Sequence, residues 1–269
     1  MKIAAKLAVS AIALVISACA TMPAGPPPLA AADYTAILAD PARQSKLEGF
    51  TAADQTDDAA RKPAEVLAFA ALRPGDTVLE MEGGRGWFSY VISKAIGPTG
   101  KLIVQYPAEF AYGDAAYKTR VDAGQLPNAT ITKSHFDQLA AADGSVDKVL
   151  WILGPHEVWF VPKDTQGLGD PAKTFADIAR VLKPGGEFIA MDHSAVVGTP
   201  AKTSAQTLHR IDPQHVLDAA KAAGLVYVEK SDILANPDDD RAKSPFSPDL
   251  RRHTDQFLVR FSKPGWVLP

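Results

Sequence analysis

The sequence predicts an α/β protein built on one doubly wound sheet of seven strands. Short runs of β-branched or apolar residues alternate along the chain with segments whose apolar residues recur at helical spacing, which is typical of a sheet covered by helices on both faces. The composition fits a single domain, because 46% of the 269 residues are apolar and 22% are charged. No internal repeat is visible.

The order of the elements follows from apolar spacing and from the residues that begin and end helices. Apolar residues at i, i+3 and i+4 mark a helix that ends at Gly97, and Asp170 and Asp212 are N-caps that each precede a proline. The expected helices cover 63–72, 88–96, 171–182 and 213–224, with a weaker segment around 114–123. The expected strands cover 77–80, 101–105, 130–132, 146–153, 187–191, 226–228 and 257–261.

The N-terminus has the features of a bacterial export signal. Lys2 and Lys6 flank a short apolar run over residues 7–16, which falls short of the roughly 20 residues that span a bilayer. Small residues then precede Cys19, and the string Ile16-Ser17-Ala18-Cys19 resembles the lipobox of bacterial lipoproteins. The resemblance implies that residues 1–18 are removed and that Cys19 is lipidated. The alternative is an ordinary secretory signal with an incidental cysteine.

The expected organisation is a signal peptide over 1–18, a lipidated Cys19 with a proline-rich tether over 19–32, and one domain over 33–269. This predicts a lipoprotein of the cell envelope that faces the periplasm and is attached to a membrane by the lipid on Cys19. Ala20 leaves open whether that membrane is the inner or the outer one. A single cysteine excludes a disulfide framework and a multi-cysteine zinc site. With 28 basic and 31 acidic side chains and a net charge of −3, no nucleic-acid partner is expected.

Two strings carry a more specific resemblance. Residues 78–86, Val-Leu-Glu-Met-Glu-Gly-Gly-Arg-Gly, resemble the strand, glycine-rich turn and helix of class I S-adenosylmethionine-dependent methyltransferases. Residues 175–188, with Leu-Lys-Pro-Gly-Gly at their centre, resemble the helix, turn and fifth strand of the same family. The resemblance covers roughly residues 62–264 and implies a Rossmann-like fold and methyl transfer from S-adenosylmethionine to a small molecule.

The last third of the chain resembles one bacterial group of exported predicted methyltransferases. The resemblance rests on three strings, which are His209-Arg210-Ile211-Asp212-Pro213, Asn236-Pro237-Asp238-Asp239-Asp240 and Thr254-Asp255-Gln256-Phe257. Asp238 to Asp240 are expected to form a solvated turn, and spacing alone assigns no metal ligands.

The family's cofactor-binding positions map onto this chain with three departures. Glu80 is the expected acid at the start of the glycine-rich motif, and Gly84 and Gly86 are two of its three glycines, but Glu82 replaces the first glycine. The position that usually holds the ribose-binding acid reads Gln105-Tyr106. The position that usually meets adenine reads His135, with Asp137 two residues later. The resemblance implies S-adenosylmethionine contacts from Glu80, Glu82, Gly84, Gly86, Tyr106 and His135.

Polar side chains that could act on a substrate follow the predicted fourth and fifth strands. His156 and Glu157 come after the fourth strand, and Asp192 and His193 end the fifth; ligand crevices of open α/β sheets lie at these strand ends. We expect His156, Asp192 and His193 to be catalytic, because a histidine can orient or deprotonate a nucleophile. The expected substrate-binding residues are Trp159, His209 and Arg210.

Three functions remain open at this point. The first is an exported, lipid-anchored methyltransferase. In the second, the fold is kept while the cofactor has changed, and the crevice binds another ligand or supports metal-assisted chemistry through His156, His193 and neighbouring carboxylates. The third is a non-catalytic envelope protein whose crevice is filled by Glu82, Tyr106 and Trp87.

Overall fold

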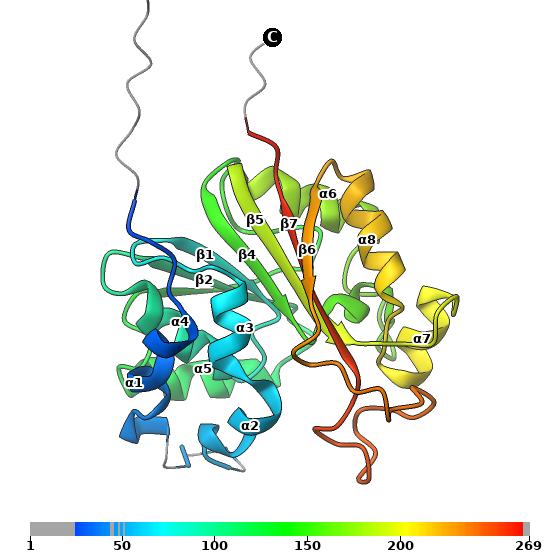
Figure 1. Ribbon diagram of the computed structural model, residues 1–269, viewed down its shortest axis with the longest axis horizontal. Coiled ribbons are helices and arrows are strands. Elements are labelled where there is room, and N and C mark those ends of the chain that lie inside the picture. Colours follow the sequence, from blue (N-terminus) through cyan, green and yellow to red (C-terminus); the bar gives the residue numbers. More distant parts are fainter. Residues whose placement is uncertain (1–24, 44–45, 48, 51, 266–269) are drawn as a thin grey trace, which may run out of the picture.

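The structure is a computed structural model that describes residues 25–265 except 44, 45, 48 and 51 (Figure 1). The expected signal peptide and Cys19 lie outside the described residues, so export and lipidation stay predictions. Within the described part of the chain, no helix is long and apolar enough to cross a bilayer.

Seven strands form one sheet in the order β3-β2-β1-β4-β5-β7-β6, which confirms the predicted architecture. Strands β1 to β5 are parallel to one another, and β7 runs antiparallel to both β5 and β6. The strands are β1 (Thr77–Met81), β2 (Lys101–Tyr106), β3 (Ala129–Lys133), β4 (Val146–Ile152), β5 (Leu182–His193), β6 (Val226–Ser231) and β7 (Gln256–Ser262).

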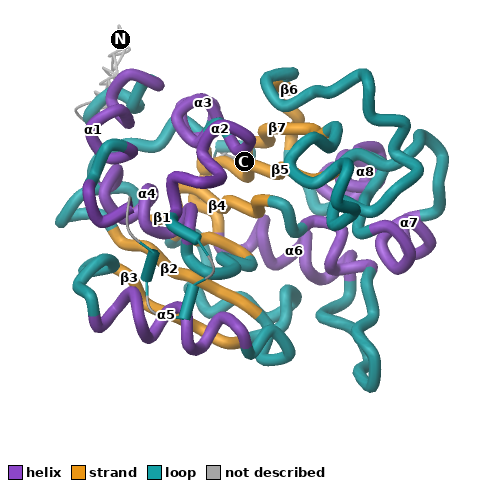
Figure 2. Tube along the Cα trace, turned by 90° about the horizontal axis from the view of Figure 1, so that it is seen from below, coloured by secondary structure: helices purple, strands orange, loops and turns teal. Residues whose placement is uncertain are grey.

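Helices cover both faces of the sheet. The α-helices are α1 (Thr35–Leu38), α2 (Asp58–Arg61), α3 (Pro63–Phe69), α4 (Trp87–Ile96), α5 (Tyr112–Asp122), α6 (Pro171–Val181), α7 (Ala201–Leu208) and α8 (Pro213–Ala222), and short 3-10 helices include η1 (Ala31–Tyr34), η3 (Asp54–Asp57) and η4 (Pro155–Trp159). One apolar core lies between the sheet and α3, α4 and α5, and a second lies against α6 and α8. Figures 1 and 2 show α1 and α4 toward one end of the molecule and α7 and α8 toward the other.

The expected helix caps are present. The carboxylate of Asp170 accepts the backbone N–H of Lys173 at the start of α6, and the carboxylate of Asp212 accepts that of Gln214 at the start of α8. Each cap satisfies an N–H that a helix leaves unpaired, and the proline that follows lacks one. These local signals explain why both helices begin where the sequence indicates.

The fifth strand begins earlier than the sequence indicates. Residues 183–186, Lys-Pro-Gly-Gly, were expected to form a turn before a strand at Glu187, but they lie within β5, which starts at Leu182. The reason is tertiary: Gly185 donates its N–H to the Lys263 carbonyl and Gly186 accepts the Lys263 N–H, so the segment after β7 pairs with these residues although Gly185 keeps a turn-like φ of 79°. A register shift between Val146 and Lys148 accommodates this start.

Two further features were not anticipated. Helix α7 follows β5 where no helix was expected. The packed structure also begins before Asp33, because Leu29 donates its N–H to the Leu72 carbonyl and packs on the first core, and Arg73 donates to the Pro26 carbonyl. The last part of the expected tether is therefore attached to the domain.

Candidate functional site

The glycine-rich turn connects the end of β1 to the start of α4. Glu82, Gly84 and Gly86 all have left-handed backbone conformations, with φ of 53°, 57° and 76°. Such a conformation costs a side-chain-bearing residue roughly 1 kcal/mol or more, so Glu82 occupies the first glycine position of the motif in a geometry that glycine would adopt more easily. A Cβ added to Gly84 would meet only the Glu82 carbonyl at 3.9 Å, which leaves space beside the turn.

Glu80 lies beneath this turn and is only 3% exposed. Ser89 of α4 donates its hydroxyl to Oε2 of Glu80, and Tyr117 Oη lies 2.9 Å from the same hydroxyl. Burial raises the pKa of Glu80 to about 8, although the Ser89 hydrogen bond and the Arg120 charge oppose this. Glu80 is therefore largely protonated at neutral pH and supports the turn as a neutral hydrogen-bonding group.

Helix α5 packs directly against the glycine-rich turn. A Cβ on Gly83 would lie 2.1 Å from Tyr117 Oη, and a Cβ on Gly86 would lie 2.7 Å from Arg120 Cδ. Arg120 Nε donates to the Arg85 carbonyl at 2.7 Å, and its Nη atoms form a buried ion pair with Asp54. Glycines at these two positions let α5 and the N-terminal segment approach the turn closely.

Trp87 also holds the N-terminal segment. It is 7% exposed, its indole N–H donates to the Asp54 carbonyl at 2.7 Å, and the Arg61 guanidinium lies 4.8 Å from its ring centroid. Trp87 therefore packs between α4 and the N-terminal segment.

The remaining predicted cofactor residues are engaged with other groups of the chain. Tyr106 is 2% exposed and donates its hydroxyl to Asp114 at 2.8 Å, and Gln105 is buried and donates to the Ser134 carbonyl. His135 is half-exposed and its Nε2 lies 2.9 Å from Oε1 of Glu109. Their proposed contacts with ribose and adenine stay predictions.

Two cavities flank the strand ends. One of about 450 Å³ is lined by His135, Asp137 and Trp159, all singled out from the sequence, together with the start of α6. Trp159 thus borders a cavity, and its contact with a substrate stays a prediction. Another of about 820 Å³ lies between α8 and strands β6 and β7, away from the glycine-rich turn.

His156 and Asp192, predicted separately after β4 and at the end of β5, form a buried pair. The side chain of His156 is 5% exposed and that of Asp192 is 0% exposed. Nδ1 of His156 lies 2.9 Å from Oδ2 of Asp192, which also accepts the His156 backbone N–H at 2.6 Å. Burial disfavours the charged imidazole of His156, but the Asp192 carboxylate outweighs this effect and raises the pKa of His156 well above its usual value. Asp192 therefore fixes the orientation of the imidazole and directs Nε2 away from itself.

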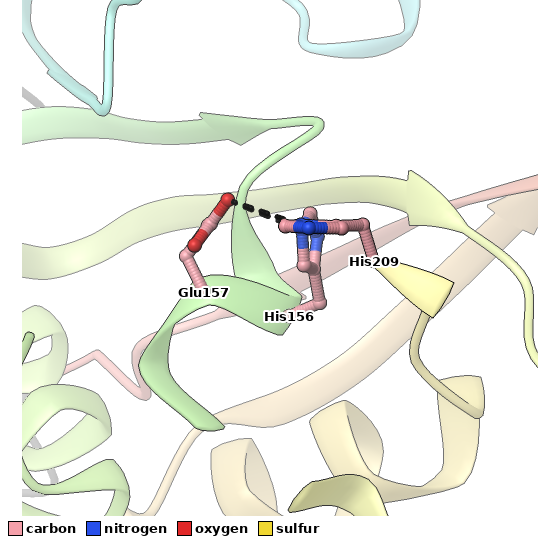
Figure 3. Close-up of side chains that lie close together, drawn as sticks. All are labelled: His156, Glu157 and His209. Atoms are coloured by element: carbon pink, nitrogen blue, oxygen red, sulfur yellow. Dashed lines mark ion pairs between the residues drawn. The ribbon is translucent and has the colours of Figure 1, made fainter. Parts of the chain in front are cut away.

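Glu157 and His209 complete a cluster around the free face of His156 (Figure 3). Oε1 of Glu157 lies 3.3 Å from Nε2 of His156 and 3.8 Å from Nδ1 of His209. Burial alone would raise the pKa of Glu157, but the two imidazoles lower it to about 2. The sequence assigned His209 to substrate binding; it lies beside His156, with ring centroids 5.5 Å apart.

Glu82 joins the same neighbourhood from the glycine-rich turn. Trp151 Nε1 donates to Oε2 of Glu82 at 3.4 Å, and a Cβ on Gly154 would lie 2.1 Å from that oxygen. Burial, and then the Glu157 charge, raise the pKa of Glu82 well above its usual value. The side chain of Glu82 therefore lies in the same neighbourhood as Glu157, and burial beside that carboxylate favours the neutral form of Glu82.

His193 and Arg210, two other predicted site residues, are bound to other parts of the chain. Nδ1 of His193 is 2.7 Å from Thr254 Oγ1, and burial lowers the pKa of His193 to about 4, so this imidazole is neutral. Arg210 is buried and donates to the carbonyls of Ser194 and Lys243 and to the carboxylate of Asp239. An anion could reach Arg210 only if this arrangement opened, so the predicted substrate contact has no support in the observed geometry.

The carboxylate cluster at 238–240 matches the expected solvated turn at Asp238 and Asp240, which are exposed, but not at Asp239. Asp239 is 5% exposed and pairs with Arg210, with Nη1 2.9 Å from Oδ2. It also accepts the backbone N–H of Asp255, whose own carboxylate pairs with Arg241. The three C-terminal strings noted in the sequence thus pack together and support His209 and His193.

Four residues that support the turn could not be found from the sequence. Ser89 binds Glu80, Tyr117 lies against Ser89 and Gly83, Arg120 binds the Arg85 carbonyl, and Asp54 pairs with Arg120, but each is ordinary in its local context. No motif marks them, and only the packing of α5 and the N-terminal segment reveals them.

Comparisons with known proteins agree with this architecture. No family model matches the chain. The ubiquinone/menaquinone biosynthesis C-methyltransferase UbiE of Escherichia coli is 26% identical over 177 residues, which cover 65% of this chain and 66% of that protein. The chain therefore matches just under two thirds of this relative's length.

Solved structures share the fold at low sequence identity. A SAM-dependent methyltransferase from Aquifex aeolicus has a TM-score of 0.53 and 19% identity, covering 87% of this chain and 99% of that one. A geranyl diphosphate methyltransferase solved with SAM has a TM-score of 0.54 and 16% identity, covering 85% and 94%. The [4+2]-cyclase SpnF has a TM-score of 0.56 and 14% identity, covering 90% and 100%. The chain has the class I methyltransferase fold, and its homologues and structural neighbours include class I S-adenosylmethionine-dependent methyltransferases.

Proposed function

We propose that the protein is an S-adenosylmethionine-dependent methyltransferase that acts on a small molecule and is anchored in the cell envelope. The observation that carries the proposal is the turn between β1 and α4, where Glu82, Gly84 and Gly86 are all left-handed at the carboxyl edge of the sheet. Homologues with the same activity class add support.

The glycine-rich turn suits the methionine end of the cofactor. The Gln105-Tyr106 position suits the ribose less well. Space beside Gly84 allows a ligand to approach the backbone, and the start of α4 favours a carboxylate. At the ribose position no ionised acceptor is present, and the Tyr106 hydroxyl is bound to Asp114. S-adenosylmethionine supplies an electrophilic methyl group when bound.

A small methyl acceptor is consistent with the site and with the relatives. UbiE is named for quinone biosynthesis, and one structural neighbour is named for geranyl diphosphate. In this chain the acceptor would lie near His156 and Glu157, which follow β4. Ionised Glu157 can accept a hydrogen bond from an acceptor hydroxyl, and His156 with Asp192 can hold a developing negative charge.

A second candidate is a protein of the same fold that has lost or changed the cofactor. Its supporting observations are protonated Glu80 and the engaged side chains of Gln105 and Tyr106. The similarity to a [4+2]-cyclase is a reminder that this fold hosts different activities.

Isothermal titration calorimetry with S-adenosylmethionine and its demethylated product separates the two candidates. Gly84→Ala is the test variant, because the added methyl group has room in the fold yet faces the proposed ligand. Gly224→Ala is the matched control, since Gly224 is also left-handed and has open space around it. We expect Gly84→Ala to weaken binding at least about tenfold, an energy of about 1.4 kcal/mol, and Gly224→Ala to leave it unchanged. Absence of heat from folded protein at millimolar cofactor would refute the proposal.

The anchoring proposal rests on the sequence around Cys19 and has its own test. Membrane fractionation of cells that express the full chain should place it in the membrane fraction, and Cys19→Ser should release it or block its processing. Equal fractionation of the two proteins would count against lipidation.

A further inference from the structure

Three buried polar atoms close to one another make no hydrogen bond: Nε2 of His156, Nδ1 of His209 and Oε2 of Glu157. The two imidazole nitrogens only face Oε1 of Glu157, at 3.3 and 3.8 Å. Buried polar atoms are almost always hydrogen-bonded in folded proteins, so three such atoms in one place require an explanation. Figure 3 shows Glu157 pointing toward the two imidazoles, which come from different parts of the chain.

The distances are close to those of a metal site. The ligand atoms of His156, Glu157 and His209 all lie within 4.8 Å of one another, and Oε1 of Glu157 is 3.3 Å from His156 and 3.8 Å from His209. Zinc bound tetrahedrally at about 2.1 Å from each ligand separates the ligand atoms by about 3.4 Å. Side-chain movements of about 1 Å would bring the three ligand atoms to this spacing.

The surroundings of His156 have the organisation expected of a metal ligand. Asp192 contacts Nδ1 at 2.9 Å and also accepts the backbone N–H of His156, so Nε2 is left to face Glu157. Metal-bound histidines commonly bind a carboxylate through the other ring nitrogen, which fixes the ring.

The backbone supports the same interpretation. His209 has a left-handed conformation, with φ of 50°, directly after α7, and Leu153, which precedes the turn that carries His156, has φ of 60°. Strained conformations of this kind concentrate at functional sites. Phe160 and Phe246 pack on the His209 ring, with centroids 4.9 and 5.2 Å away, and hold it against Glu157.

We propose that His156 Nε2, Glu157 and His209 Nδ1 bind a divalent first-row transition metal ion of the zinc type. Two imidazoles and one carboxylate suit such an ion and leave a coordination position for water or for an oxygen of the substrate. His193, which the sequence suggested as a metal ligand, is bound to Thr254 instead. This metal-site proposal holds whether or not the protein transfers methyl groups. Because the site follows β4, the bound ion could polarise a substrate hydroxyl at the strand ends.

The test measures metal binding directly. The full chain is purified without a histidine tag, stripped with a chelator, and titrated with Zn²⁺ and Co²⁺. We expect about one ion per chain by elemental analysis, and a Co²⁺ visible spectrum with the intense bands of a four- or five-coordinate site. A ligand at 100 times its dissociation constant should also stabilise the protein by about 2.7 kcal/mol.

The variants separate this site from adventitious surface binding. Glu157→Gln keeps the shape of the side chain, and His209→Ala removes a half-buried ring, so both leave the fold in place; each should reduce Zn²⁺ affinity at least about tenfold. Asp192→Asn, which acts through His156, should weaken binding about 10- to 100-fold and alter the Co²⁺ spectrum. His253→Ala, at an exposed histidine, is the matched control and should bind as the original protein does.

The outcomes distinguish this proposal from the proposed function. Less than about 0.1 ion per chain at saturating Zn²⁺, or unchanged affinity in both Glu157→Gln and His209→Ala, would overturn the metal site. Neither result depends on S-adenosylmethionine. A Gly84→Ala variant that loses the cofactor should keep the metal.

Discussion

Replacement of Glu80 by glutamine should remove a pH dependence of stability. Burial raises the pKa of this carboxyl from 4.5 to about 8. Between these values the folded state binds more protons than the unfolded state, so the free energy of unfolding decreases as pH rises. The neutral form stabilises the fold fully below pH 4.5, and this contribution is lost as pH rises toward 8 and beyond.

The magnitude follows from the shift. With one titrating group at these two pKa values, raising the pH from 5 to 8 should lower the free energy of unfolding by about 3 kcal/mol. Glutamine has nearly the same shape and can accept the Ser89 hydroxyl, which donates to Oε2 of Glu80, but it does not titrate. The difference between the two proteins should therefore grow with pH.

Urea denaturation followed by tryptophan fluorescence at pH 5, 6, 7 and 8 measures this difference. Glu80→Gln should become more stable than the original protein as pH rises, by about 3 kcal/mol over the range. Glu65→Gln, at an exposed glutamate, is the control and should follow the original protein. Parallel pH profiles of Glu80→Gln and the original protein would refute the assignment of a protonated buried carboxyl.

Two further predictions concern packing. Gly83→Ala should destabilise the protein by about 1–3 kcal/mol, because its Cβ would lie 2.1 Å from Tyr117 Oη, whereas Gly265→Ala, with open space around it, should be neutral; thermal denaturation that shows equal losses would contradict this packing. Arg210→Met should cost about 3–5 kcal/mol in urea denaturation, because it leaves the buried carboxylate of Asp239 without its cation. A loss below about 1 kcal/mol would show that the pair is not buried in solution.

The strands and most helices could be predicted because their signals are local. Apolar spacing and the caps Asp170 and Asp212 placed α6 and α8 within a few residues. The predicted start of β5 was wrong because Lys-Pro-Gly-Gly indicates a turn locally, whereas hydrogen bonds to Lys263 add Gly185 and Gly186 to the strand. Helix α7 was missed because no side chain caps its start, so it lacks the local signal that marks α6 and α8.

The sequence by itself determined the fold class and the residue types available at the strand ends, because both follow from periodicity and from the order of strands. It also named His156 and Asp192 as catalytic and His209 as substrate-binding, without placing the three side chains in contact. Only the tertiary structure decided that His156 is oriented by Asp192, that His209 and Glu157 face its free nitrogen, and that Glu82 lies in the same neighbourhood. Residues distant in sequence meet because parallel strands end at one edge of the sheet, and burial there sets which carboxyl groups keep their protons.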